Sequence, residues 1–221
     1  MPARSAARDG RETVGSASRF PGCGGRAVLM GKRAVFLDRD GTILQLIPYL
    51  HEADRVRLLP GVAESLRRLG EAGYGRILVT NQSGVARGWF GMDDVEGVHD
   101  RLLYLLRAEG ADLDGIEICP HHPDHTGPCS CRKPASGMIE RAALRFGLSL
   151  KESWVIGDRM DDLLAGAALG CRGILVLTGY GQEEARLRDP ARLADACYVA
   201  HDLAAAVAHL IAVDGSVGPP A

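Results

Sequence analysis

The chain has 221 residues, 46% hydrophobic and 24% charged, and its 26 Lys and Arg against 28 Asp and Glu give a formal net charge of -2. This composition is typical of a globular protein and excludes an intrinsically disordered chain. Nucleic-acid binding is not expected, because the charge is near neutral and aromatic residues, which stack on bases, make up only 5%. No apolar run approaches the roughly 20 residues that cross a bilayer, so no membrane partner is expected.

The two ends of the chain differ in composition from its centre. Residues 1–31 are rich in Gly, Ser and Arg without periodicity, which predicts a disordered extension. We add the hypothesis that native translation starts at Met30, because the first predicted strand begins shortly after it. Residues 214–221 are expected to form a loose tail, which leaves residues 32–213 as one domain.

Short apolar runs alternate with amphipathic stretches along this domain. In chain order, the pattern predicts a strand over Arg33–Leu37, a helix from Pro60 to Gly73, a strand over Arg76–Thr80, and a helix N-capped by Asp93 that ends at Gly110. It then predicts a strand over Gly115–Cys119, a loop over 120–136, a helix over 138–146, and a strand over Trp154–Ile156. A helix over Asp161–Leu169, strands over Gly173–Leu177 and Cys197–Ala200, and a helix over Leu203–Ala212 complete the domain.

This alternation predicts an α/β fold, a three-layer, doubly wound parallel sheet of the Rossmann-like kind. In such sheets, ligands bind beyond the carboxyl ends of the strands. The interval between Asp38 and Thr80 holds only a short flap and one helix, so we expect no cap domain.

Polar residues follow four of the predicted strands. The first is followed by Asp38-Arg39-Asp40-Gly41-Thr42, which puts two carboxyl groups in a small volume, although Asp and Gly are also common turn residues. The second ends in Thr80 and is followed by Asn81-Gln82-Ser83-Gly84, whose hydroxyls and amides suit phosphate oxygens but also turns.

The other two strands are followed by a lysine and by three acidic residues. Cys131-Arg132-Lys133-Pro134 offers a fixed positive charge for a phosphoryl group. Asp158 directly follows the fourth strand, and oxygen ligands of this kind suit Mg²⁺. Asp161 and Asp162 could belong to the same site or could simply be favoured at a helix N-terminus.

The predicted loop over 120–136 contains a cluster of metal-ligand residues. The preferred set is Cys119, His121, Cys129 and Cys131, whose nitrogen and sulfur atoms could hold one tetrahedral zinc ion in a closed, structural site. His122 and His125 remain alternative ligands. Such a cluster indicates a reducing compartment, so we expect a cytoplasmic protein, and we expect a monomer.

Together, the strings DRDGT, TNQSG, CRKP and GDRMDD make the chain resemble the haloacid dehalogenase-like phosphohydrolase superfamily. Within it, the chain is similar to the group of heptose bisphosphate phosphatases and histidinol-phosphate phosphatases. The resemblance implies an enzyme that removes the 7-phosphate of D-glycero-D-manno-heptose 1,7-bisphosphate, a step in nucleotide-activated heptose biosynthesis. It also implies catalytic Mg²⁺ and the same zinc ligands.

The resemblance further implies a role for each motif residue. Asp38 would be the nucleophile that forms an aspartyl-phosphate, and Asp40 the general acid and base. Mg²⁺ would be held by Asp38, the Asp40 backbone carbonyl and Asp158. Thr80 and Lys133 would stabilise the phosphoryl group. The implied substrate contacts are Asn81, Gln82, Ser83, Arg132 and Arg159.

One segment departs from the pattern of that group. The flap after the first strand reads Leu44-Gln45-Leu46-Ile47-Pro48-Tyr49, which is less polar than the group's usual flap. This leaves open histidinol phosphate, or another small phosphate monoester, as the substrate. A zinc-organised binding module without catalysis is the alternative from another functional class.

Overall fold

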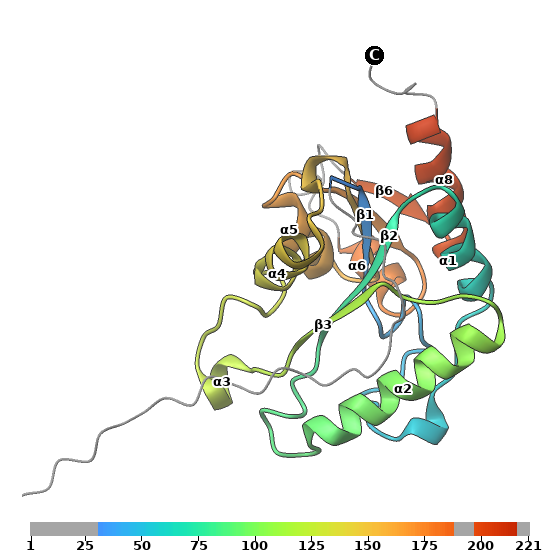
Figure 1. Cartoon of the computed structure of the whole chain (residues 1–221). Helices are drawn as coiled ribbons and strands as arrows, with labels where there is room; N and C mark the ends of the chain where they lie inside the picture. The colour runs from blue at the N-terminus through green and yellow to red at the C-terminus, as the bar shows by residue number, and fades with distance from the viewer. Residues whose placement is uncertain (1–30, 188–196, 216–221) are drawn as a thin grey trace, which may run out of the picture.

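Six short apolar runs form a single parallel sheet in the computed structural model, which describes residues 31–187 and 197–215 (Figure 1). The strands are β1 (Ala34–Leu37), β2 (Gly75–Asn81), β3 (Gly115–Cys119), β4 (Trp154–Gly157), β5 (Arg172–Val176) and β6 (Cys197–Ala200). Their order across the sheet is β3-β2-β1-β4-β5-β6, and every neighbouring pair is parallel. This confirms the predicted doubly wound sheet.

Helices cover both faces of the sheet and complete three layers. They are α1 (Val62–Glu71), α2 (Met92–Ala108), α3 (Pro123–Thr126), α4 (Gly137–Phe146), α5 (Met160–Ala167), α6 (Gly181–Arg186) and α8 (Leu203–Gly215), with short 3-10 turns η1 (Ala53–Arg55) and η2 (Leu150–Glu152). Figure 1 shows α1 and α8 on one side of the sheet and α4 and α5 on the other.

The strands divide their side chains between two hydrophobic clusters. On β1, Val35 and Leu37 pack with residues of α1, α2 and α8, whereas Ala34 and Phe36 pack with α4 and α5. Successive side chains of a strand point to opposite faces, so a strand covered on both faces is apolar throughout. This burial explains why the strands lack an alternating polar pattern.

The direction of winding reverses between β1 and β4, and this reversal positions the site. From β1 the chain moves outward to β2 and β3, and from β4 it moves outward the other way. Leu37 pairs with both Leu78 and Ile156, so Asp38 emerges beside the ends of β2 and β4. Ligands of doubly wound sheets bind at this switch point.

No cap domain lies between Asp38 and Thr80, where the structure has η1, α1 and β2, as predicted. The predicted disordered extension and the hypothesis of a start at Met30 concern residues outside the described part, apart from Gly31. The same is true of residues 216–221 of the predicted tail.

Three predictions about element limits were wrong. The helix assigned an N-cap at Asp93 begins at Met92, and the carboxylate of Asp94 accepts a hydrogen bond from the Gly91 amide at 2.8 Å. The loop over 120–136 contains α3, which begins at Pro123. The last helix continues to Gly215, because Asp214, assigned to the loose tail, is anchored to the rest of the domain.

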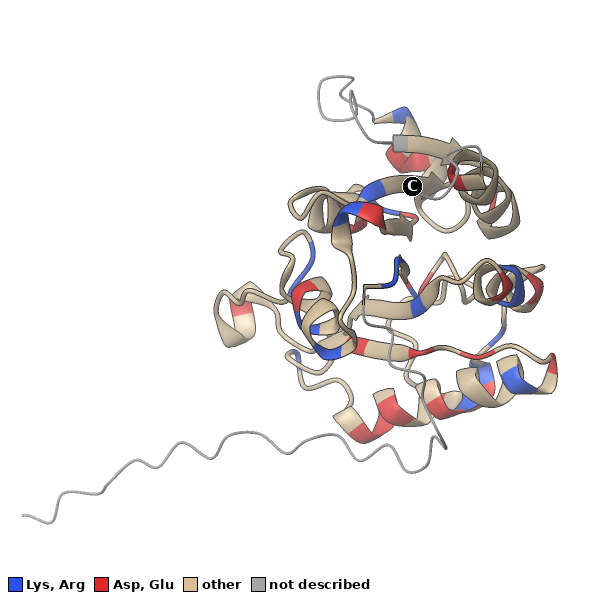
Figure 2. Cartoon of the chain, turned by 45° about the horizontal axis from the view of Figure 1, so that its top comes forward, with Lys and Arg blue, Asp and Glu red and all other residues tan. Residues whose placement is uncertain are grey.

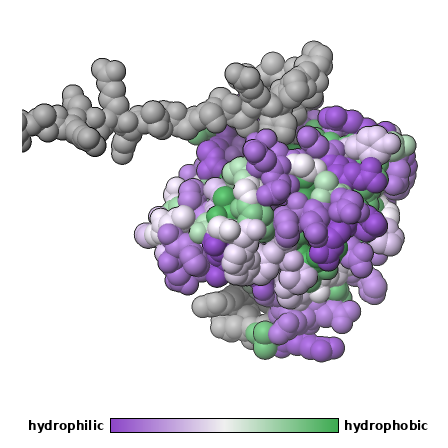
Figure 3. Space-filling view, turned by 90° about the horizontal axis from the view of Figure 1, so that it is seen from below, coloured by the Kyte–Doolittle hydropathy of each residue, from purple (hydrophilic) through white to green (hydrophobic). Residues whose placement is uncertain are grey.

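Acidic and basic residues are distributed over the same helices (Figure 2). Lys and Arg alternate with Asp and Glu along the helices in Figure 2, consistent with the near-neutral charge. Figure 3 shows a mainly hydrophilic face with small apolar areas. Within 31–187 and 197–215, no helix is both long and apolar enough to cross a membrane.

Candidate active site

Three buried carboxylates meet beyond the carboxyl ends of β1 and β4. Asp38 follows β1, Asp158 follows β4, and Asp162 lies in the first turn of α5, with one oxygen of each within 4.8 Å of the others. Their exposed fractions are only 8%, 1% and 3%. Like charges this close are stable together only if protons or cations neutralise them.

Burial has a large effect on two of these carboxyl groups. It raises the pKa of Asp38 to about 7, a rise that Lys133 opposes and that Asp162 and Asp40 reinforce. Burial and the neighbouring Asp38 raise the pKa of Asp158 to about 8. A divalent cation would relieve this repulsion, and oxygen ligands from a few carboxylates are the set that Mg²⁺ accepts.

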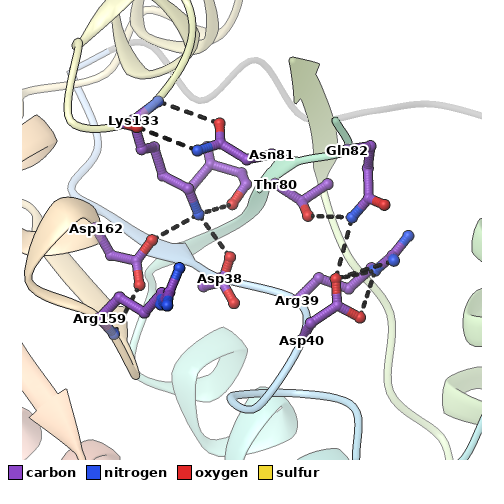
Figure 4. A network of polar contacts seen from close by, with 10 residues as sticks. Asp38, Arg39, Asp40, Thr80, Asn81, Gln82, Lys133, Arg159 and Asp162 are labelled. Carbon is purple, nitrogen blue, oxygen red and sulfur yellow. Dashed lines mark hydrogen bonds and ion pairs between the residues drawn. The ribbon is translucent and has the colours of Figure 1, made fainter. Parts of the chain in front are cut away.

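Lys133 supplies one positive charge to this cluster. Its side chain is buried, and Nζ lies 2.5 Å from an oxygen of Asp38, 2.7 Å from one of Asp162 and 2.8 Å from the Val79 carbonyl (Figure 4). Burial alone would lower the pKa of Lys133, but Asp162 and Asp38 outweigh it and raise the pKa. The lysine is therefore charged, and it points its ammonium group at the predicted nucleophile.

Asp162 both belongs to the site and lies favourably at a helix N-terminus, the two roles that the sequence left open. One oxygen pairs with Lys133, and the other accepts a hydrogen bond from the Arg159 amide at 3.0 Å, the position expected of a first-turn carboxylate. Both oxygens thus have protein partners. Asp162 acts on the site by holding Lys133.

Asp40 turns its carboxylate away from the other three acids. Its oxygens accept hydrogen bonds from Arg39 and, at 3.0 Å, from the Gln82 amide, which also donates to the Thr80 hydroxyl at 2.8 Å (Figure 4). The predicted contribution of Asp40 to a metal is through its backbone carbonyl, so this orientation leaves that prediction untested.

Glycines make room for Asp158. A Cβ on Gly41 or on Gly179 would overlap the Asp158 carboxylate, and Gly41 has a φ of 91° that disfavours other residues. Asp158 in turn accepts a hydrogen bond from the Tyr180 amide at 2.8 Å. The Gly in the DRDGT string thus leaves space for the carboxylate of Asp158, which follows another strand.

The predicted substrate contacts differ in how free their side chains are. The amide of Asn81 is paired with the backbone of Lys133, accepting at 3.1 Å and donating at 3.2 Å. Arg132 donates to the His121 carbonyl at 3.3 Å, and Arg159 stacks on the Tyr180 ring at 4.4 Å. Asn81 and Gln82 therefore face the pocket and also hold other residues of the site in place through hydrogen bonds.

The residues predicted to bind magnesium, the phosphoryl group and the rest of the substrate all line one pocket of about 360 Å³. Residues of the four motifs line part of it, Leu46, Ile47, Pro48 and Tyr49 of the flap form an apolar wall, and Arg87 and His122 add further polar groups. A hollow of about 650 Å³ near η1 and α2 holds none of the motif residues. The pocket at the strand ends is therefore the candidate active site.

The cysteine and histidine residues predicted as zinc ligands also come together. The sulfur of Cys131 lies 3.3 Å from that of Cys119, 3.5 Å from that of Cys129 and 3.2 Å from Nδ1 of His121. Sulfur atoms about 3.8 Å apart are expected around a tetrahedral zinc ion with Zn–S bonds of about 2.3 Å. Burial raises the pKa of Cys119 to about 12, a cost that a bound cation would remove. These four residues could therefore hold a metal.

The two alternative histidines contact an arginine instead. Nε2 of His122 lies 2.9 Å from Arg87, and Nε2 of His125 lies 3.4 Å from it. Cys171 is buried in the hydrophobic cluster that also includes Cys119 and Cys131, but it does not belong to the group of four possible ligands.

Sequence reasoning missed several residues around the pocket. No role was predicted for Arg39, which lies between Asp38 and Asp40, or for Tyr180 and Arg87, which line the pocket. Applying the strand-end rule to β5 would have found Thr178, whose hydroxyl donates to the Gly41 carbonyl at 2.6 Å, and Tyr180. Arg87 carried no such signal, because it comes from a turn after β2.

Known proteins share this fold and these motifs. A family model described as HAD-hydrolase-like matches residues 130–206. A D-glycero-D-manno-heptose-1,7-bisphosphate 7-phosphatase from Thermosynechococcus vestitus is 41% identical over 189 residues, which cover 80% of this chain and 95% of the relative. The chain belongs to the haloacid dehalogenase-like hydrolases. A D-glycero-beta-D-manno-heptose-1,7-bisphosphate 7-phosphatase from Haemophilus ducreyi is 40% identical over 156 residues, 68% of this chain and 86% of the relative.

Solved structures of haloacid dehalogenase-like proteins agree with this assignment. A D,D-heptose 1,7-bisphosphate phosphatase from B. bronchiseptica, complexed with magnesium and phosphate, matches with a TM-score of 0.75 and 35% identity, over 82% of this chain and 99% of that one. A putative HAD-like phosphatase from Mesorhizobium loti matches with a TM-score of 0.74 and 32% identity, over 90% of this chain and 93% of that one. The family predicted from the four motifs is thereby confirmed.

Proposed function

We propose that this enzyme removes the 7-phosphate of D-glycero-D-manno-heptose 1,7-bisphosphate through an aspartyl-phosphate on Asp38. The observation that carries the proposal is the meeting of Asp38, Asp158 and Lys133 at the switch point of the sheet. Relatives about 40% identical are named for this reaction. The product would enter nucleotide-activated heptose biosynthesis.

The residues of the cluster suit one catalytic Mg²⁺ ion. Asp38, Asp158 and the Asp40 backbone carbonyl would hold it, and when bound it supplies positive charge that orients the phosphate and offsets its charge. The three mutually repelling buried carboxylates support this assignment. The magnesium in the B. bronchiseptica structure is consistent with it.

Asp38 is the group placed to attack phosphorus. Lys133 holds one of its oxygens at 2.5 Å, and the positive charge of Lys133, with the Thr80 hydroxyl nearby in the pocket, stabilises the phosphoryl group. Attack breaks the bond between phosphorus and the sugar oxygen and leaves the phosphoryl group on Asp38.

Asp40 acts on the leaving oxygen and then on water. It first gives a proton to the sugar oxygen, and it then takes one from the water that hydrolyses the aspartyl-phosphate. Its side chain is 23% exposed and lines the pocket, so both substrate and water can reach it.

The rest of the substrate would contact residues around the pocket mouth. We assign Asn81, Gln82, Ser83, Arg132 and Arg159 to this role, with the two arginines facing the second phosphate. The apolar wall formed by Leu46, Ile47 and Pro48 offers few partners to sugar hydroxyls. That wall favours histidinol phosphate as the second candidate substrate.

The Cys119, His121, Cys129 and Cys131 group would hold a structural zinc ion. A closed set of four ligands leaves no position for a reacting water. The ion would order the loop that carries Arg132 and Lys133 into the pocket. Thiolate ligands require reduced cysteines, which supports a cytoplasmic location. We further propose that the enzyme acts as a monomer.

A substrate panel tests the proposal. Phosphate release is measured from both anomers of heptose 1,7-bisphosphate and from histidinol phosphate, with Mg²⁺ and with a chelator. We expect the highest kcat/KM on a heptose bisphosphate and loss of activity with the chelator. A tenfold preference for histidinol phosphate would favour the second candidate, and no phosphatase activity on any ester would favour a binding module.

A further inference from the structure

The guanidinium group of Arg39 is enclosed in the protein immediately beside the active site. Its side chain has no exposed surface, although Asp38 and Asp40 on either side of it reach the pocket. Burying a charge is costly unless it is paired and hydrogen-bonded. The partners of Arg39 therefore indicate what the buried charge does.

The main partner of Arg39 is Asp40. Nε lies 3.1 Å from each oxygen of the Asp40 carboxylate, and Nη2 lies 2.9 Å from one of them (Figure 4). This forked contact fixes the plane of the carboxylate, which a single contact from an ammonium group would not do. Gln82 donates to the same carboxylate at 3.0 Å and so limits its movement further.

The outer nitrogens of Arg39 contact two other parts of the chain. Nη2 donates to the carbonyl of Leu50 at 3.4 Å, and Leu50 is a buried residue directly after Tyr49 of the flap. Nη1 lies 3.3 Å from Nε2 of His99, which is buried in α2. Arg39 therefore joins Asp40 to the flap and to α2.

His99 is suited to accept from this arginine. Burial and the nearby charge of Arg39 lower the pKa of His99 to about 3, so the ring is neutral. Because a guanidinium group only donates, Nε2 must be the acceptor and Nδ1 carries the proton. The ring thus supports Arg39 without adding a second buried charge.

We propose that Arg39 is a positioning residue that holds the carboxylate of Asp40 at the leaving oxygen and couples it to the flap and α2. This inference rests on the proposed function, in which Asp40 is the general acid and base. Arg39 touches no reacting atom and acts only through Asp40.

The test compares Arg39→Lys with Arg76→Lys. Lysine keeps the charge at position 39 but cannot make the forked contact. Arg76 is a matched control, because it makes a similar contact with Asp114, at 2.9 Å, at the other end of β2. Three quantities are measured: kcat on the substrate best used by the wild type, the rate of the first turnover of phenyl phosphate, and the affinity for BeF₃⁻ with Mg²⁺, a mimic of the phosphoryl group on Asp38.

We expect Arg39→Lys to lower kcat on the sugar ester by about 100-fold, the usual effect of losing general acid catalysis. Phenolate is a better leaving group than a sugar alkoxide and depends less on protonation, so the first turnover of phenyl phosphate should fall less. The affinity for BeF₃⁻ should not change, and Arg76→Lys should match the wild type in all three measurements.

Wild-type kcat in Arg39→Lys would overturn the inference. So would an equal loss in all three quantities, since that would show a general structural role. A wild-type enzyme inactive on every ester would instead refute the proposed function, and the inference would fail with it. The wild type is measured first so that these failures are distinguished.

Discussion

Asp38, Asp158, Asp162 and Lys133 form a cluster in which the acids outnumber the base. Lys133 pairs with Asp38 and with Asp162, while Asp158 has only the Tyr180 amide among the contacts described here. Burial keeps water from screening the remaining repulsion. The cluster therefore keeps an excess of negative charge around Asp38.

Replacing Asp38 by Asn should abolish turnover while the protein still folds. Asn has almost the same shape and can still accept a hydrogen bond from Lys133, but its amide is a poor nucleophile. We expect phosphate release to fall by at least about 1000-fold. Asp112→Asn, at an exposed ion pair with Arg107, serves as the control for which no change is expected. Wild-type turnover in Asp38→Asn would contradict the proposed mechanism.

Mg²⁺ should bind more tightly and stabilise the protein more as the pH rises from 6 to 9. In the metal-free protein the pKa values of Asp38 and Asp158 are raised to about 7 and about 8. Raised pKa values mean that these groups favour folding most at low pH, and that this stability is lost as the pH rises through 7 and 8. Mg²⁺ replaces the lost protons, so its effect on Tm should grow over that range.

The comparison is made by thermal unfolding and calorimetric titration of chelator-treated protein. Asp38→Asn is the control, because it removes one of the two titrating groups and should flatten the pH dependence. Equal Mg²⁺ affinity at pH 6 and pH 9 in the wild type would contradict the prediction.

At the scale of elements, the segment between β3 and α4 is organised by contacts at a few points. It contains a single short helix, α3, and otherwise relies on the group of Cys119, His121, Cys129 and Cys131 and on the Asn81 contacts to the Lys133 backbone. Ordering such a segment costs conformational entropy. A metal bound by four side chains offsets that cost.

Replacing both Cys129 and Cys131 by Ser should lower zinc content and phosphatase activity together. Loss of the metal would loosen the loop and move Lys133 away from Asp38, so we expect at least about a tenfold loss of activity. Zinc is measured by elemental analysis of the purified protein. Cys171→Ala is the matched control, because that thiol is buried but is not one of the four possible ligands, so its loss should leave the metal content unchanged. Full activity in a zinc-free double variant would refute the role of the metal.

At the scale of the whole molecule, one carboxylate ties the end of α8 to β4, to β5 and to the residues that directly precede β1 and β2. Asp214 accepts hydrogen bonds from the Tyr74 hydroxyl and from the Trp154 indole at 3.1 Å, and it pairs with Arg172 at 2.6 Å and with Arg33 at 3.3 Å. Burial opposes ionisation of Asp214, but these hydrogen bonds and charges lower its pKa. The carboxylate links residues that are far apart in the sequence.

Asp214→Asn should lower the free energy of unfolding by about 1–3 kcal/mol, because buried donors lose a charged acceptor. The activity should not change, since the residue lies away from the pocket. Since the pKa of Asp214 is lowered, its contribution is present above about pH 4, the value in the unfolded chain, and is lost as the pH falls further. The difference from the wild type should therefore shrink in acid.

Urea unfolding of both proteins, followed through tryptophan fluorescence, measures this difference. Asp112→Asn removes an exposed ion pair and should change stability by less than about 0.5 kcal/mol. Equal stability of Asp214→Asn and the wild type at pH 7 would contradict the prediction.

The strands, the sheet class and the main motif residues were predictable from the sequence by itself. Continuous apolar runs indicate strands that are buried on both faces. Asp38, Thr80 and Asp158 lie at the ends of such runs, where a parallel sheet binds its ligands, so their positions follow from the local sequence. The choice of His121 with three cysteines was also predicted, but the sequence could not separate it from His122 and His125. Only the structure shows the latter two beside Arg87.

The tertiary structure alone decided which polar side chains contact one another. Asp162 meets Lys133, Arg39 reaches His99, and Asp214 meets Arg172 across long intervals of sequence. Each pairing depends on how helices dock against the sheet, and a contact of about 3 Å is not encoded in any local pattern. Local periodicity therefore determined the elements and the positions of the acids, while packing decided which of those acids remain without a positive partner.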